Sequence, residues 1–148
     1  QVDSIYTESK FCLYGDYYKS GHQVYAIDLL SEGLDYDSTG HIIGTGCNLY
    51  LSDIFVPKDS TQRLPAGRYE MDSVAKDMRF LRGMYFDGSV TGAYLLMIQD
   101  SQIQRIILLK RGTMTIKYVE DDVFLDFNLY LADSTRYHCT YTGSVIYR

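Results

Sequence analysis

The side chains that most often perform catalysis or bind metals are few in this 148-residue chain. None of the histidines, His22, His41 and His138, has a second histidine or a glutamate at the spacing of a helical zinc site. No Gly-x-Ser-x-Gly segment marks a serine nucleophile. Gly44-Thr45-Gly46 leads into a predicted strand, so it lacks the helix N-terminus that a phosphate cradle needs. The sequence therefore predicts no enzyme and no cofactor.

Two aspartates have the spacing of the first half of a calcium-binding loop. Asp35, Asp37 and Thr39 would occupy its first three ligand positions. Gly46 then stands at the twelfth position, where a bidentate glutamate is required. Aspartates in such a segment also accept hydrogen bonds from their own backbone and form a polar turn. We expect a turn with no metal, and Asp35, Asp37 and Thr39 are the residues to inspect for a cation.

Carboxylates in predicted strands suggest one further function, that of a hydrolase. A glycosidase needs two carboxylates that face each other about 5–10 Å apart. Asp16, Asp28, Glu70 and Asp126 qualify by position, but nothing in the sequence selects a pair. This function is the least favoured of those considered.

The chain has three cysteines, Cys12, Cys47 and Cys139, and an odd number cannot pair completely within one chain. We expect three free, buried thiols that behave as small apolar side chains. A Cys12–Cys139 bridge between the terminal strands is the alternative. None of the three lies at a helix start or beside a basic residue that would lower its pKa, so none is expected to act as a nucleophile.

The predicted elements are strands. Positions 123–131 alternate strictly between apolar and polar residues, which is typical of a strand with one buried face. The segments 112–118 and 136–147 alternate in the same way and complete a meander, whereas 93–99 and 103–109 are apolar on both faces and are expected to be central. Further strands are expected at 11–18, 25–30, 47–51 and 68–71, and residues 72–89 are assigned a short helical turn and a strand near 84–86.

Fifteen tyrosines and the absence of any long helical period support an all-β class. With turn signals every 8–15 residues, we expect a single domain over residues 1–148, an antiparallel β-sandwich of nine or ten strands. A partly closed, calycin-like β-barrel is the alternative.

Residues 48–53 read NLYLSD and residues 128–133 read NLYLAD. The repeat is better explained by two strands that meet the same local structural requirement than by duplication of half the chain. Parity directs Leu49, Leu51, Leu129 and Leu131 into the core, and it directs Asn48, Tyr50, Asn128 and Tyr130 outward. Asp53 and Asp133 are expected to end their strands in turns.

Outward aromatic residues are the most suggestive functional feature. Tyrosine offers a large contact area and a hydrogen-bonding group at a low entropic cost, so exposed aromatics mark recognition surfaces. The predicted ligand-binding residues, which lie on faces opposite the inferred core, are Tyr14, Tyr18, Asn48, Tyr50, Phe124, Asn128 and Tyr130.

The net charge of −5 argues against nucleic acid as a partner, because phosphate binding needs clustered Lys and Arg. Arg79 with Arg82, and Lys110 with Arg111, are the nearest approach to a basic patch and are expected to be solvated surface. No apolar run reaches the roughly 18 residues that a membrane helix needs.

Five short segments together resemble a family of small secreted or lipid-anchored all-β proteins of Bacteroidetes-type bacteria. They are YGDYY (14–18), GTGCNLYL (44–51), LPAGRYEMDS (64–73), RGTMTI (111–116) and YTGSV (141–145). This chain departs from the pattern at Arg68, where the turn motif usually has threonine. The resemblance implies a secreted or cell-envelope location, periplasmic or on the outer surface. Membrane contact is then expected only through a lipid anchor upstream of Gln1.

The expected function is a non-enzymatic cell-envelope domain that binds protein or glycan partners through its aromatic-bearing sheet face or loops. The alternative is a β-barrel that carries a small apolar ligand, with 93–99 and 103–109 lining the cavity.

Overall fold

The computed structural model describes the backbone of residues 2–147 and the side chains of residues 5–147. Over this range the chain forms fourteen strands and no helix, which confirms the predicted all-β class. It follows that the part described has no helix that could cross a membrane.

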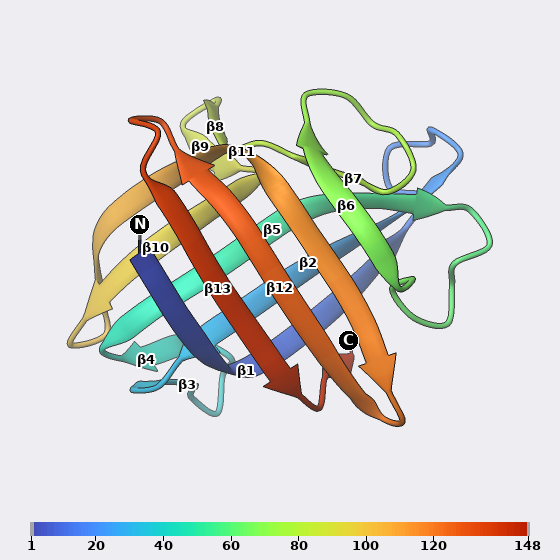
Figure 1. The fold of residues 1–148 in the computed structure, drawn as a ribbon. Helices are drawn as coiled ribbons and strands as arrows, with labels where there is room; N and C mark the ends of the chain where they lie inside the picture. The colour runs from blue at the N-terminus through green and yellow to red at the C-terminus, as the bar shows by residue number, and fades with distance from the viewer. Residues whose placement is uncertain (1, 148) are drawn as a thin grey trace.

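Ten strands form one sheet that folds into two crossing layers (Figure 1). The front layer comprises β6 (Gly67–Asp72), β12 (Asp122–Leu131), β13 (Arg136–Gly143), the second half of β11 (Gln102–Val119) and the start of β1 (Val2–Gly15). The rear layer comprises β2 (His22–Ser31), β5 (Gly46–Pro57), β10 (Ala93–Gln99) and the rest of β1 and β11. The remaining members are β7 (Arg79–Leu81), which pairs with β5 and β6, and β14 (Ile146–Tyr147), which pairs with β1.

Two short hairpins lie outside this sheet. One pairs β3 (Leu34–Tyr36) with β4 (Ile42–Gly44), and the other pairs β8 (Met84–Phe86) with β9 (Ser89–Thr91). The first hairpin packs Leu34 against Leu30 and Ile98 in a small apolar cluster separate from the main core.

Strands β1 and β11 pass from one layer to the other. The β1–β2 register shifts between Tyr6 and Glu8, and the β11–β12 register shifts between Leu109 and Arg111. Such bulges bend a strand and let it turn a corner between packed sheets. Pairing of β10 with β5 then closes the path β10-β11-β12-β13-β1-β2-β5 into a ring.

The core fills the space between the two layers. On β12, Val123, Leu125, Phe127 and Leu129 are all buried, which confirms the parity predicted for this strand. The largest fully buried side chains are aromatic: Phe11, Tyr25, Phe55, Tyr69, Phe80 and Phe127.

Several details differ from the prediction. The sheet is mixed, because β1 runs parallel to β13 and β14, and β6 runs parallel to β7. The segments predicted as two strands at 103–109 and 112–118 are one strand, β11, which continues through its bulge. Five strands of three residues, of which only β8 was predicted, and one strand of two residues raise the count above nine or ten. Residues 72–89 contain no helical turn.

The two copies of the repeated hexamer share their parity but not their ends. Leu49, Leu51 and Leu129 are buried as predicted, whereas Leu131 is only partly buried at the end of β12. Asp133 does lie in a turn, where its carboxylate accepts the Thr135 N–H at 2.9 Å. The prediction for Asp53 is wrong, because β5 runs on to Pro57 and buries that carboxylate within the strand.

Candidate functional site

The predicted binding residues separate onto the outer faces of the two layers. Tyr14 and Tyr18 lie at the far end of β1 and in the turn that follows it, against the rear layer. The Asp16 carboxylate fixes this turn, because its two oxygens accept the N–H groups of Ser20 at 2.8 Å and Gly21 at 3.1 Å. The side chains of Tyr17 and Tyr18 are thus carried on an ordered turn.

Three exposed tyrosines in this region contact one another. The ring centroids of Tyr14 and Tyr17 are 6.3 Å apart, and those of Tyr17 and Tyr18 are 5.0 Å apart, both edge-to-face. These rings border a hollow of about 290 Å³ whose lining includes Ser52 and Asp53 from β5. We call Tyr14, Tyr17 and Tyr18 the tyrosine patch.

Asp53 brings a carboxylate to the hollow beside the patch. It is 7% exposed. Its Oδ1 accepts the Tyr18 hydroxyl, and its Oδ2 accepts the Ser52 hydroxyl at 2.6 Å. Burial, followed by the bond to the carboxylate, raises the pKa of the Tyr18 hydroxyl above its ordinary value. The patch therefore combines aromatic rings with a Tyr18 hydroxyl that stays protonated at neutral pH.

Tyr50 and Asn48 both point to the outer face of β5, but Tyr50 borders a hollow whereas Asn48 is buried. Tyr50 lines a smaller hollow of about 120 Å³ with Tyr14 and Asp28. Asn48 is only 2% exposed, and its amide donates to Asp28 and, at 2.9 Å, to the Leu29 carbonyl. The prediction that Asn48 faces solvent is wrong, because the apolar contacts of the β3–β4 hairpin cover that part of the layer.

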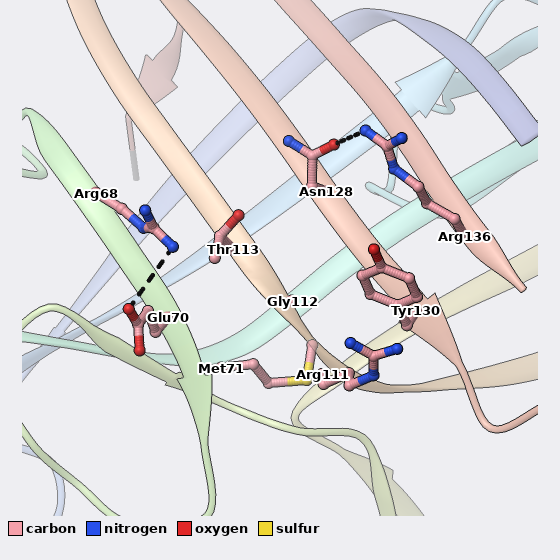
Figure 2. Close-up of a pocket in the computed structure, with 9 residues that line it drawn as sticks. All are labelled: Arg68, Glu70, Met71, Arg111, Gly112, Thr113, Asn128, Tyr130 and Arg136. Carbon is pink, nitrogen blue, oxygen red and sulfur yellow. Dashed lines mark hydrogen bonds and ion pairs between the residues drawn. The ribbon is translucent and has the colours of Figure 1, made fainter. Parts of the chain in front are cut away.

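A second hollow lies on the outer face of the front layer, over β6, β11, β12 and β13 (Figure 2). Its volume is about 490 Å³. Two of the predicted residues, Asn128 and Tyr130, line it together with three arginines that the sequence did not single out for binding: Arg68, Arg111 and Arg136. We call this hollow the arginine groove.

Strand register explains why these residues meet. Tyr130 is paired with Arg111 on one side and with Arg136 on the other. Directly opposite residues of neighbouring strands point to the same face, so the three form one row across the sheet. The next row places Asn128 beside Thr113, and Thr113 beside Glu70.

The groove arginines are held by neighbours of different kinds. The Arg111 guanidinium stacks 3.8 Å above the Tyr130 ring. Arg136 donates to the Asn128 side-chain oxygen at 2.6 Å, and Arg68 lies 3.8 Å from the Glu70 carboxylate (Figure 2). Among the described residues that line the groove, Glu70 is the one with a carboxylate.

Parity alone could have found part of this site. Alternation predicts that Tyr130 points outward, and the same alternation along 136–147 places Arg136 on the face opposite the buried Tyr137. The hairpin register that pairs the two residues was unknown. Phe124 shares the outer face of β12 with Asn128 and Tyr130, though it does not line the groove.

The calcium-loop residues form the turn of the β3–β4 hairpin. The Asp37 carboxylate accepts the backbone N–H groups of Thr39 at 2.8 Å and His41 at 2.9 Å, together with the Thr39 hydroxyl at 2.7 Å. These bonds, led by that of the Thr39 hydroxyl, lower the pKa of the Asp37 carboxyl. Asp35 accepts the N–H of Tyr36. Within residues 5–147, no three Asp, Glu, His or Cys side chains are grouped so as to hold a metal.

The strand-borne carboxylates each have a partner other than a second carboxylate. Asp126 lies 2.7 Å from His138 Nε2, and Asp28 accepts the hydroxyl of Tyr36 at 2.7 Å as well as the Asn48 amide. Nothing in these contacts favours a hydrolase.

All three cysteines are free thiols, and only Cys139 is fully buried, whereas Cys12 and Cys47 are partly exposed. Burial, followed by the nearby Asp126 carboxylate, raises the pKa of the Cys139 thiol. We expect iodoacetamide at pH 8 to leave Cys139 unmodified in the folded protein and to label it once denaturant is added. Peptide mass spectrometry checks this, and labelling of Cys139 as fast as Cys12 without denaturant would contradict the buried position.

The protein is all-β, and open hollows lie on the outer faces of both layers. No family model matches the chain, no curated protein matches it and no solved structure matches it.

Proposed function

We propose that the protein is a non-enzymatic binding domain of the cell envelope that recognises a glycan or protein partner through the tyrosine patch. The observation that carries this proposal is the exposure of Tyr14, Tyr17 and Tyr18 beside Ser52 and Asp53. The envelope location is supported by the sequence resemblance.

The chemistry of the patch favours a glycan. The C–H face of a sugar ring is apolar and packs on an aromatic ring, while its hydroxyls need hydrogen-bonding groups at the side. Tyr17, which is 66% exposed, supplies an aromatic surface, and the Ser52 and Asp53 side chains supply polar atoms within the same hollow. Aromatic anchors beside a few fixed polar groups are the usual composition of small binding sites.

The test is binding of neutral oligosaccharides, with cello-, xylo-, manno- and malto-hexaose as the ligands in calorimetric titrations. Tyr17→Ala is expected to weaken binding at least about tenfold, because a central aromatic anchor contributes more than about 1 kcal/mol. Its thermal stability should stay close to that of the wild type, because the ring is largely exposed.

The matched control is Tyr85→Ala on the β8–β9 hairpin, where the ring is 59% exposed and does not line the hollow beside the patch. This variant should bind as the wild type does. Equal binding by the wild type and Tyr17→Ala would contradict a role for the patch. Turnover of glycosidic, ester or peptide substrates that one point substitution abolishes would contradict the non-enzymatic assignment.

A further inference from the structure

We propose that the tyrosine patch prefers amino sugars, whose ammonium group is attracted by the Asp53 carboxylate at the base of the patch. This inference rests on the proposed function, because it uses the same hollow and names the class of glycan that the hollow takes. It adds a preference for positively charged sugars over neutral ones, and that preference can be tested on its own.

The surroundings of the Asp53 carboxylate are the first argument. The residue is 7% exposed, and it borders the hollow. Its described partners are two neutral hydroxyl groups, those of Tyr18 and Ser52. Among the described residues, none with a basic side chain forms an ion pair with Asp53. Burial of a charge is costly unless an opposite charge pairs with it, so a cation held in the hollow would stabilise this carboxylate.

The carboxylate also has acceptor capacity left for a ligand. Its two oxygens offer about four lone-pair positions, and each oxygen accepts one of the two hydroxyls. An ammonium group only donates hydrogen bonds, which suits a group that only accepts them. A buried charge is screened less than an exposed one, so Asp53 attracts a cation in the hollow even without direct contact.

The neighbours of Asp53 hold the carboxylate in place before a ligand arrives. The Ser52 hydroxyl donates to Asp53 at 2.6 Å and accepts the Gly92 N–H at 2.8 Å, so its orientation is fixed from both sides. The Tyr18 hydroxyl fixes the other carboxylate oxygen. A charge that is already oriented loses less entropy when a ligand binds.

The aromatic rings are the second argument. Tyr14, Tyr17 and Tyr18 border the same hollow and are 47%, 66% and 50% exposed. The face of an aromatic ring attracts a cation, and this attraction adds to the packing of the C–H groups of a sugar on the ring. Neighbouring rings of the patch meet edge-to-face, so the patch presents ring surfaces in more than one direction.

The size and lining of the hollow favour one amino sugar unit of a chain. Its volume of about 290 Å³ lies at the lower end of the range of about 300–1,000 Å³ for ligand sites. Of the described residues that line it, Asp53 is the only one with a charged side chain. An acidic sugar would therefore be repelled by the same carboxylate that attracts an ammonium group.

The test is calorimetric titration with three hexasaccharides of the same linkage at about pH 6, where amines keep their protons. Hexaglucosamine carries ammonium groups, hexa-N-acetylglucosamine carries the same nitrogens acetylated and uncharged, and cellohexaose lacks them. Hexaglucosamine is expected to bind about tenfold or more tighter than either neutral sugar, because cation–π contacts and hydrogen bonds between charged groups add affinity. Equal binding of all three by the wild type would overturn the inference and leave the proposed function standing.

Two variants separate the charge of the carboxylate from its hydrogen bonds. Asp53→Asn removes the charge and keeps the shape, and it should bind hexaglucosamine no better than cellohexaose. Tyr18→Phe removes one hydroxyl and keeps both the ring and the charge, so it should retain the preference even if Asp53→Asn fails to fold in a thermal melt. Loss of the preference in Tyr18→Phe would mean that the hydroxyl selects the sugar and would overturn the role of the charge.

Asp121→Asn is the matched control, because Asp121 is an exposed aspartate in the turn between β11 and β12, outside the hollow. This substitution removes the same charge, and the preference for hexaglucosamine should be unchanged. A loss equal to that of Asp53→Asn would mean that only the net charge of the chain matters, and it would overturn the site. Equal competition by hexalysine would overturn the assignment to a sugar. Failure of the proposed function differs from these outcomes, since Tyr17→Ala would then bind every sugar as the wild type does.

Discussion

Replacing Leu129 by alanine is expected to lower the free energy of unfolding by about 2–5 kcal/mol. The side chain is 0% exposed and belongs to the main core between the two layers. Its neighbours are held by strands on both sides, Gly112 on β11 and Tyr137 on β13, so they cannot collapse far into the space left by the substitution. Urea denaturation followed by circular dichroism measures the change.

The adjacent residue provides the control. Tyr130 points to the opposite face of β12, where its ring is only partly buried and stacks under Arg111. Tyr130→Ala should therefore cost much less stability than Leu129→Ala. If the two costs were reversed, β12 would be shifted by one residue, since such a shift moves every side chain to the other face.

Replacing Gly112 by alanine is expected to destabilise the protein strongly and to disrupt the arginine groove as well. Gly112 has a φ of +147°, a conformation that other residues adopt only with strain of about 1–3 kcal/mol. A Cβ atom there would lie 2.3 Å from the Asn128 carbonyl oxygen and 2.8 Å from the Leu129 Cα. Both are backbone atoms of the paired strand, so β11 and β12 would have to separate at the bulge. Thermal melting measures the loss of stability.

Gly88→Ala separates strain from steric conflict. Gly88 also has a positive φ, +80°, but a Cβ atom at this position meets nothing within 4 Å. This variant should lose only the conformational cost, about 1–2 kcal/mol. A loss of stability at Gly112 no larger than at Gly88 would show that the two strands are not closely apposed there.

Local patterns predicted the parts of this fold that are governed by local physics. The bounds of β10 match the predicted 93–99, and the alternation of β12 matches its burial, because a period of two reports directly which face is covered. The sequence predicted a turn at Lys110-Arg111, between strands at 103–109 and 112–118. It is a bulge within one strand, since the positive φ of Gly112 lets β11 bend and continue.

The rest depends on contacts between distant segments. No residue near Asn48 in the sequence predicts that the β3–β4 hairpin will cover its face. No residue near Asp53 predicts that β5 continues beyond it. The arginine groove required the registers of three strand pairs at once, which is why Asn128 and Tyr130 were found and Arg68, Arg111 and Arg136 were not. Residues predicted as one surface are thus divided between two.

The parallel pairing of β1 with β13 also determines the order in which the chain can fold. Tyr6 and Tyr137, whose hydroxyls lie 2.5 Å apart in the interior, are separated by 131 residues. Doubling the length of such a loop adds only about 0.6 kcal/mol to the cost of closing it, so the finished protein loses little stability. The long separation instead lowers the folding rate, because contacts between distant segments must form before they stabilise the protein. During synthesis on the ribosome, one edge of the start of β1 would stay unpaired until β13 has been made. Such an unpaired edge can pair with the wrong segment of chain. Strand β13, which shields the start of β1, is thus synthesised long after it.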